Sequence, residues 1–204
     1  MNVRIVTPRR RSIVRKVKNW REYKEDLKVD FNNYCAYCGS YDGYKHTYYE
    51  VDHFVPKSFF GPLGNIGLNQ YDNLVYSCKF CNNKKLNKWP SQSEKVYHNG
   101  REGFVDPCSK EYDEHLYRTE EGAIMWKTEL GKWMHTSGFK FDERERGIRL
   151  VYQLNKLRLI TDELLEQGDK LDKDSAEYNL MVEKVNQCNM EYVKFHKELM
   201  DYYK

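Results

Sequence analysis

Apolar residues near the N-terminus recur at helical spacing. Trp20, Tyr23, Leu27 and Phe31 stand three, four and four residues apart, with charged residues between them. This spacing places the four side chains on one face of a helix. We therefore predict an amphipathic helix over about residues 18–31, which leads the chain into its first pair of cysteines.

The last third of the chain has the longest regular pattern. From Leu150 to Leu164 leucines follow helical spacing, and Gly168 stands where such a helix would end. A second stripe then repeats at steps of three and four residues, and it consists of Tyr178, Met181, Val185, Cys188, Tyr192, Phe195 and Leu199. Asp174, with Glu177 three residues later, predicts a capping box at the start of this helix. We expect a helical hairpin.

The hairpin has two interpretations. It can be an ordinary helical cap on the core, or it can carry a surface on which a partner docks. A leucine-bearing partner helix covers only part of the second stripe, so we expect Tyr192, Phe195, Tyr202 and Tyr203 to remain exposed. Exposed aromatic side chains of this kind are typical of interfaces.

The middle of the chain has short, irregular patterns. Tyr44–Val51 is typical of a strand or hairpin arm, Leu74–Tyr76 predicts a second short strand, and a helix should open near Cys78 and end before Pro90. Residues 54–72 contain two prolines, three glycines and no sustained period, which predicts a loop. A loop of that length inside a compact core is usually functional.

Length and composition narrow the class of protein. The chain has 204 residues, which allows one domain or a compact core with one appendage. Aromatic residues make up 15% and charged residues 32%, a balance that suits a globular protein and argues against disorder. The sequence has no apolar run of membrane-spanning length and no secretory signal, so we expect a cytoplasmic protein without a membrane span.

Charge is unevenly distributed along the chain. The net charge is only +3, yet residues 1–21 hold eight basic and no acidic side chains, and residues 161–204 hold six basic and eleven acidic ones. The two ends are therefore expected to face different partners. The basic end can grip a nucleic-acid backbone, or it can be a solvated or disordered arm. The candidate contacts are Arg9, Arg10, Arg11, Arg15 and Lys16.

Four of the six cysteines form two identical pairs. Cys35-x-x-Cys38 and Cys78-x-x-Cys81 are separated by 39 residues (78 − 38 − 1). In a reducing compartment such pairs seldom form disulfides, and together they supply the four thiolates of a tetrahedral structural zinc site. A thioredoxin-like redox pair would need a βαβ context, which the sequence lacks. Cys188 lies outside the pattern and is expected in the helical core.

Residue types that carry hydrolytic chemistry gather between the cysteine pairs. They are Asp52 and His53 after the first expected strand, Asn73 before the second, and Asn82, Lys84 and Lys85 at the start of the following helix. Carboxylate and amide oxygens suit Mg²⁺ or Mn²⁺ better than zinc. Imidazole supplies a base, an asparagine amide can hold the backbone or a ring in place, and ammonium groups attract phosphate. This is the minimum set for hydrolysis of a phosphodiester with one metal ion.

The order of these motifs resembles a known family. The segments E-V-D-H-F-V-P-K-S, D-N-L-V and C-K-F-C-N-N-K-K, with the first cysteine pair ahead of them, look like the four-cysteine branch of the HNH nucleases. The resemblance covers residues 35–90 and implies an α+β fold whose nuclease core is a ββα-metal finger with a structural zinc. Around it we expect a basic lead and helix in residues 1–34, a mixed connecting region in 91–140 and a helical hairpin in 141–204.

The resemblance also assigns roles. His53 matches the family's first histidine and Asn73 its middle asparagine. Asn82 occupies the third position, where the family often has histidine. Asparagine in place of histidine at this position bears on the preferred metal more than on the activity.

The implied mechanism uses one cation. His53 acts as general base on the attacking water, while Asp52 and Asn82 hold Mg²⁺ or Mn²⁺. Asn73 braces the loop and orients His53, and Lys85, or Lys84 beside it, meets phosphate.

The resemblance implies partners as well. The substrate expected for such a nuclease is DNA. Small HNH proteins with helical tails resemble the nuclease subunits of anti-phage systems, notably the Septu type that works with an ABC-like ATPase. The C-terminal helices are therefore expected to dock such an ATPase or a second copy of the chain. A free-standing restriction or mobile-element nuclease, or a zinc-stabilised binding module that has lost cleavage, are the alternatives.

Overall fold

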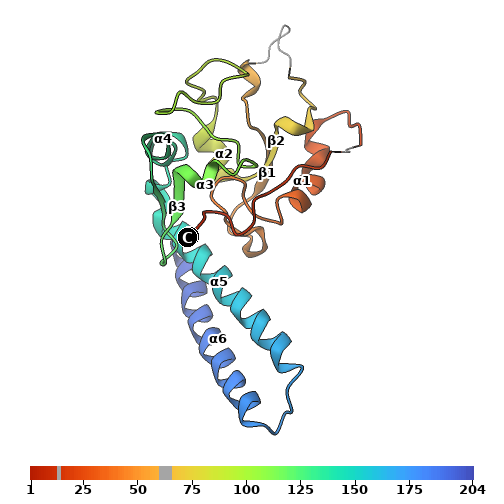
Figure 1. Cartoon of the computed structure of the whole chain (residues 1–204), viewed down its shortest axis with the longest axis vertical. Coiled ribbons are helices and arrows are strands. Elements are labelled where there is room, and N and C mark those ends of the chain that lie inside the picture. Colours follow the sequence, from red (N-terminus) through yellow and green to blue (C-terminus); the bar gives the residue numbers. More distant parts are fainter. Residues whose placement is uncertain (13–14, 60–65) are drawn as a thin grey trace. The chain divides into compact units, whose positions relative to one another are not determined.

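The computed structural model describes residues 1–12, 15–59 and 66–204, drawn in Figure 1. The chain divides into two compact units, Met1–Glu145 and Arg146–Lys204. The first unit mixes helices with two small sheets, and the second is a pair of helices. Among the helices of the described residues, none is both long enough and apolar enough to cross a bilayer.

A ββα element forms the centre of the first unit. Strand β1, Tyr49–His53, pairs antiparallel with β2, Leu74–Cys78, and helix α2, Lys79–Lys85, follows β2 directly. The register places Tyr49 opposite Cys78 and His53 opposite Leu74. The expected ββα core is therefore confirmed, with β1 beginning five residues later than the predicted strand and β2 ending two residues later.

The predicted N-terminal helix is present and begins as a tighter turn. A 3₁₀ turn over Trp20–Tyr23 runs into α1, Lys24–Asp30. Asn19 caps the turn through a reciprocal capping box with Glu22, which satisfies backbone donors at the helix start. Leu27, on the predicted apolar face, is completely buried.

The connecting region contains elements that the sequence pattern left unassigned. They are α3 (Tyr112–His115), β3 (Leu116–Arg118), β4 (Ile124–Trp126), α4 (Glu129–Trp133) and a π-helical turn (Met134–Gly138). Strands β3 and β4 form an antiparallel hairpin. The buried Arg118 donates a hydrogen bond from Nη2 to the carbonyl oxygen of Cys38 at 2.6 Å, so the hairpin is tied to the first cysteine pair.

The second unit is the expected helical hairpin. Helices α5, Glu145–Gly168, and α6, Ala176–Tyr202, lie side by side and run in opposite directions (Figure 1). The cap of α6 is Ser175, whose hydroxyl accepts a hydrogen bond from the backbone N–H of Tyr178. The capping box predicted at Asp174 is therefore wrong by one residue.

The predicted stripe on α6 is the packed face of that helix, and its expected aromatic patch is not exposed. Tyr192, Phe195, Tyr202 and Tyr203 are all half-buried. The expectation of an exposed patch is wrong, and for Tyr202 and Tyr203 the reason is that both side chains lie against Gly147 in the first turn of α5. The exposed apolar residues of α6 lie off the stripe and include Leu180, Met190, Val193 and Met200.

This burial predicts how the hairpin responds to truncation of its side chains. Phe195→Ala removes a half-buried ring from the packed face and should cost about 2 kcal/mol of unfolding free energy, less than a fully buried phenylalanine. Val193→Ala, at a side chain that is 66% exposed, is the matched control and should melt like the unmodified chain. Thermal melts followed by circular dichroism measure both. Equal melting temperatures for the two variants would contradict the packing of Phe195.

Candidate active site and metal centre

The four predicted cysteines converge on one point. Their Sγ atoms all lie within 4.8 Å of one another, and every one of the four residues is buried. Four thiolates bound tetrahedrally at 2.3 Å from a zinc ion are about 3.8 Å apart, and the Sγ atoms of Cys38 and Cys78 lie 3.8 Å apart. The cluster therefore fits a structural zinc ion, whose ligands would be Cys35, Cys38, Cys78 and Cys81.

A buried arginine contacts this cluster. Arg144 donates a hydrogen bond from Nη2 to Sγ of Cys81 at 2.8 Å. Desolvation disfavours its charge, but the neighbouring cysteines outweigh that effect and hold the pKa of Arg144 above its ordinary value. Because a zinc ion with four thiolates carries a net negative charge, a buried cation beside it is stabilising. Sequence spacing gave no sign of this residue.

His53 ends β1 and has a fixed orientation. Its Nε2 lies 2.9 Å from the carbonyl oxygen of Leu68, and its ring meets the ring of Trp20 edge to face at 4.9 Å between centroids. A carbonyl oxygen only accepts hydrogen bonds, so Nε2 carries the proton and the lone pair of the neutral ring lies on Nδ1. Burial lowers the pKa of His53, which favours the neutral ring.

Asn73 holds the chain just beyond His53. Its amide nitrogen donates to the carbonyl oxygen of Val55 at 3.1 Å, and its Oδ1 accepts from the backbone N–H of Val55 at 2.8 Å. The backbone N–H of Phe54 also donates to the carbonyl oxygen of Asn73 at 2.8 Å. These three bonds fit the bracing role predicted for Asn73.

Lys85 is placed differently from the prediction. It is fully buried, and its Nζ donates to the carbonyl oxygen of His53 at 2.8 Å and lies 3.2 Å from Oδ2 of Asp52. Tyr37 donates its hydroxyl to the same Oδ2 at 2.7 Å. This burial does not fit a contact between Lys85 and phosphate, because Lys85 lies on the face of α2 that packs against β1. Its neighbour Lys84 is at the surface and pairs with Glu143.

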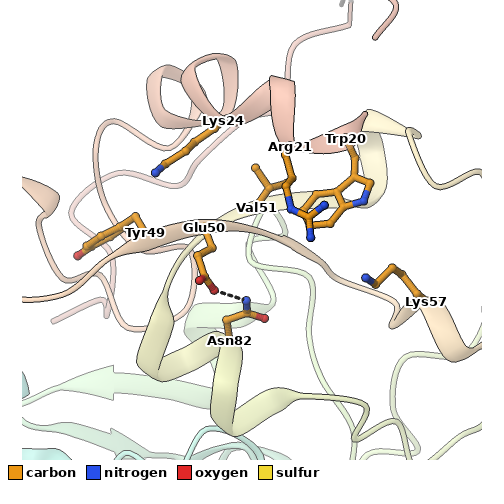
Figure 2. Close-up of a pocket in the computed structure, with 8 residues that line it drawn as sticks. All are labelled: Trp20, Arg21, Lys24, Tyr49, Glu50, Val51, Lys57 and Asn82. Atoms are coloured by element: carbon orange, nitrogen blue, oxygen red, sulfur yellow. Dashed lines mark hydrogen bonds between the residues drawn. The ribbon is translucent and has the colours of Figure 1, made fainter. Parts of the chain in front are cut away.

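Asn82 contacts the carboxylate of Glu50, a residue that was not among the predicted site residues. Its amide nitrogen donates to Oε2 of Glu50 at 2.8 Å (Figure 2). Glu50 and Asp52 are two residues apart in β1 and so share the face of the strand on which α2 packs. The E-x-D alternation within the strand was the available signal.

The oxygen donors on this face suit a hard divalent cation. Asp52 uses Oδ2 for Lys85 and Tyr37, which leaves Oδ1, among the described contacts, for another ligand. The amide of Asn82 can present its oxygen after rotation about its terminal bond, because the two ends of the amide are nearly equivalent in shape. Carboxylates with an amide oxygen fit Mg²⁺ or Mn²⁺.

A pocket of about 410 Å³ adjoins these donors. It is lined by Trp20, Arg21, Lys24, Tyr49, Glu50, Val51, Lys57 and Asn82. Trp20 and Arg21 enter from one side of β1, while Glu50 points from the strand toward Asn82 on the other (Figure 2). His53 is not a lining residue and meets the pocket through its contact with Trp20.

The basic cluster at the N-terminus is largely ion-paired. The pairs are Arg10 with Asp106 at 2.9 Å, Arg11 with Asp30 at 2.6 Å and Arg15 with Asp26 at 3.5 Å. Arg10 also donates to the carbonyl oxygen of Leu74, the first residue of β2. Arg9 and Lys16 are exposed. The pairing fits a lead that is fixed to the core better than a disordered arm.

Comparison with known proteins agrees with the geometry of the core. Residues 35–88 match the family model described as HNH endonuclease, so the chain carries an HNH endonuclease domain over that segment. No curated protein and no solved structure matched the chain. The matched segment contains both cysteine pairs, His53, Asn73 and Asn82.

The cysteine geometry predicts one zinc ion per chain. Cys78→Ser should lose zinc and unfold the first unit, because zinc binding supplies folding free energy of about 10–16 kcal/mol in small zinc-finger peptides. Elemental analysis and circular dichroism measure the two effects. Cys188→Ser, at a cysteine outside the cluster, is the control and should keep the metal content. Two zinc ions per chain, or none, would rule out a single four-thiolate site.

The burial of Lys85 predicts a structural role. Lys85→Met leaves the carboxylate of Asp52 without its buried cation and should cost roughly 3–5 kcal/mol of unfolding free energy. Lys84→Met, at the adjacent surface residue, should unfold at nearly the same urea concentration as the unmodified chain. If Lys85→Met kept its stability but lost activity, the result would instead support the predicted contact between Lys85 and phosphate.

Proposed function

We propose that the chain is a metal-dependent endonuclease that hydrolyses phosphodiester bonds in DNA. The observation that carries the proposal is the orientation of His53 within the HNH domain. Its Nε2 is bound to the carbonyl oxygen of Leu68, and its ring contacts Trp20, which lines the same pocket as the oxygen donors Glu50 and Asn82. A base of fixed tautomer at the edge of a pocket that holds candidate cation ligands is the arrangement that hydrolysis of a phosphodiester needs.

His53 acts as the general base in this proposal. Its ring is neutral near pH 7, because burial lowers its pKa below the ordinary value of about 6.5. Nδ1 takes a proton from the water molecule that attacks phosphorus, while Nε2 stays bound to Leu68. Asn73 keeps the ring in place by holding the backbone of the next two residues.

Asp52 and Asn82, with Glu50 as a further oxygen donor, would hold the divalent cation. Bound Mg²⁺ or Mn²⁺ would neutralise charge on the scissile phosphate and stabilise the leaving 3′-oxygen. Lys85 and Tyr37 fix the carboxylate of Asp52 from the buried side. They act through Asp52, and we assign them no contact with substrate.

The biological setting is a separate part of the proposal. We propose that this nuclease serves anti-phage defence together with an ABC-like ATPase. The support is the resemblance of small HNH proteins with helical tails to such nuclease subunits. Nicking of plasmid DNA by the purified protein alone, against nicking only with a co-purifying ATPase, decides between a free-standing enzyme and a partner-dependent one.

His53→Ala tests the base. We expect plasmid nicking in Mg²⁺ or Mn²⁺ to fall about 10²–10⁴-fold, as is typical when a general base is lost. The zinc content should stay the same, because His53 is not a ligand of the cysteine cluster. Wild-type nicking by this variant would overturn the assignment. If the unmodified chain nicks no DNA with any divalent cation, a binding module without cleavage is the better description.

Substitutions at the oxygen donors test the cation site. Asn82→Ala and Asp52→Asn should each shift the titration of activity toward higher Mg²⁺ or Mn²⁺ concentration, because each removes or weakens an oxygen ligand. Glu50→Gln should shift it in the same direction if Glu50 shares the cation. The control is Glu114→Gln, at an exposed carboxylate away from the site. Unchanged titrations for all three variants would contradict this ligand set.

A further inference from the structure

The pocket beside the candidate cation site is rich in available positive charge. Arg21, Lys24 and Lys57 are all exposed, and within the described part of the chain none of them forms an ion pair. Among the lining residues that the structure describes, Glu50 is the only acidic one. Three cations against one carboxylate leave an excess of positive charge next to Asn82.

Three of the five predicted N-terminal contacts do not have this freedom, whereas Arg9 and Lys16 are exposed. Arg10, Arg11 and Arg15 are each paired with a carboxylate, and the side chain of Arg10 is only 9% exposed. A cation that is already paired gains less from phosphate than an unpaired one, because the existing pair must first be broken. Among the basic residues near the candidate site, Arg21, Lys24 and Lys57 therefore have more charge available to a ligand than the three paired arginines.

Trp20 connects this charge to the candidate base. The guanidinium carbon of Arg21 lies 4.2 Å from the centroid of the indole ring, and Nζ of Lys57 lies 5.2 Å from it. The same ring meets His53 at 4.9 Å. Cation–π contacts at these distances are attractive, so the indole holds two cations in place beside the residue that would activate water.

We propose that this pocket is a phosphate clamp, in which Arg21, Lys24 and Lys57 bind backbone phosphates of the nucleic-acid strand next to the scissile bond. The inference rests on the proposed function and adds to it the residues that hold the substrate. Trp20, Arg21 and Lys24 precede residue 35 and so lie outside the segment that matches the HNH model. Trp20 is a positioning residue, because its ring orients the side chains of Arg21 and Lys57.

Binding without cleavage tests the clamp independently of the nuclease activity. A short fluorescent DNA duplex, and an RNA duplex of the same length, are titrated in Ca²⁺ or without divalent cation and followed by fluorescence anisotropy. The test variant is Arg21→Ala/Lys24→Ala/Lys57→Ala. The control is Lys170→Ala/Lys173→Ala/Lys184→Ala, which removes the same charge from exposed lysines of the second unit.

The clamp predicts a loss of both affinity and salt dependence. Each lost contact with duplex DNA makes the slope of log K against log salt shallower by about 0.9. The slope of the triple variant should therefore be shallower by roughly 2–3. At low salt this variant should bind about tenfold or more weakly than the unmodified chain. The control should keep its slope. The duplex that responds to the substitutions identifies the substrate backbone as DNA or RNA. Equal affinity and slope for the triple variant and the unmodified chain on both duplexes would overturn the clamp.

Trp20 is tested by a change that keeps the charge. Trp20→Ala should weaken binding while keeping the salt slope, because the cations remain but lose their orientation, and Trp20→Phe should restore most of the affinity. A thermal melt of both variants excludes unfolding as the cause. If Trp20→Ala binds like the unmodified chain, the indole does not position the cations. A chain that binds through the clamp yet nicks nothing with any divalent cation would refute the proposed function and leave the clamp standing.

Discussion

The convergence of four cysteine side chains on one point is the constraint on which the HNH domain depends. The first pair follows α1, and the second pair spans the junction of β2 and α2. Bringing the pairs together fixes the end of β2, and the register then sets Tyr49 opposite Cys78 and His53 opposite Leu74. The candidate base His53 thus stands at the far end of a five-residue ladder that the cysteine cluster anchors. In the part of the chain that the structure describes, β1 and β2 form a two-stranded sheet, so no third strand helps to specify this register.

The same cluster sets the rotation of α2 about its own axis. Cys81 lies in the first turn of the helix, so the positions of Asn82 and Lys85 around it follow from helical geometry. Asn82 reaches Glu50, and Lys85, three residues on, reaches Asp52 and the carbonyl oxygen of His53. The short helix α2 therefore supplies Asn82, a candidate ligand of the metal ion, and Lys85, the buried side chain that holds Asp52. Each depends on the cysteine immediately before Asn82.

What the sequence could and could not predict follows from the range of each interaction. Local sequence pattern was enough to predict the features that have regular spacing. These are the cysteine pairs, the two strands and the α6 stripe. Arg144 and Cys81 are 63 residues apart, and Arg10 and Asp106 are 96 apart, so neither contact has a local signal. The burial of Lys85 was missed because a lysine near a catalytic motif suggests phosphate, and only the packing of α2 on β1 shows its partner. Tyr192 and Phe195 were correctly placed on a stripe, but how much of that stripe is covered depends on packing that local spacing does not show.

Positive charge along the chain also has to be weighed against its local partners. The first 21 residues are the most basic part of the sequence, yet their arginines differ in what they can do. Arg10 and Arg11 are paired with carboxylates from other segments and fasten the lead to the core. Arg21, from the same basic segment, has an aromatic partner in Trp20, and a cation over an indole keeps its charge available to a third group. Attraction for phosphate therefore depends on which cations remain unpaired after folding, and Arg21 and Lys57, both in contact with Trp20, are among them.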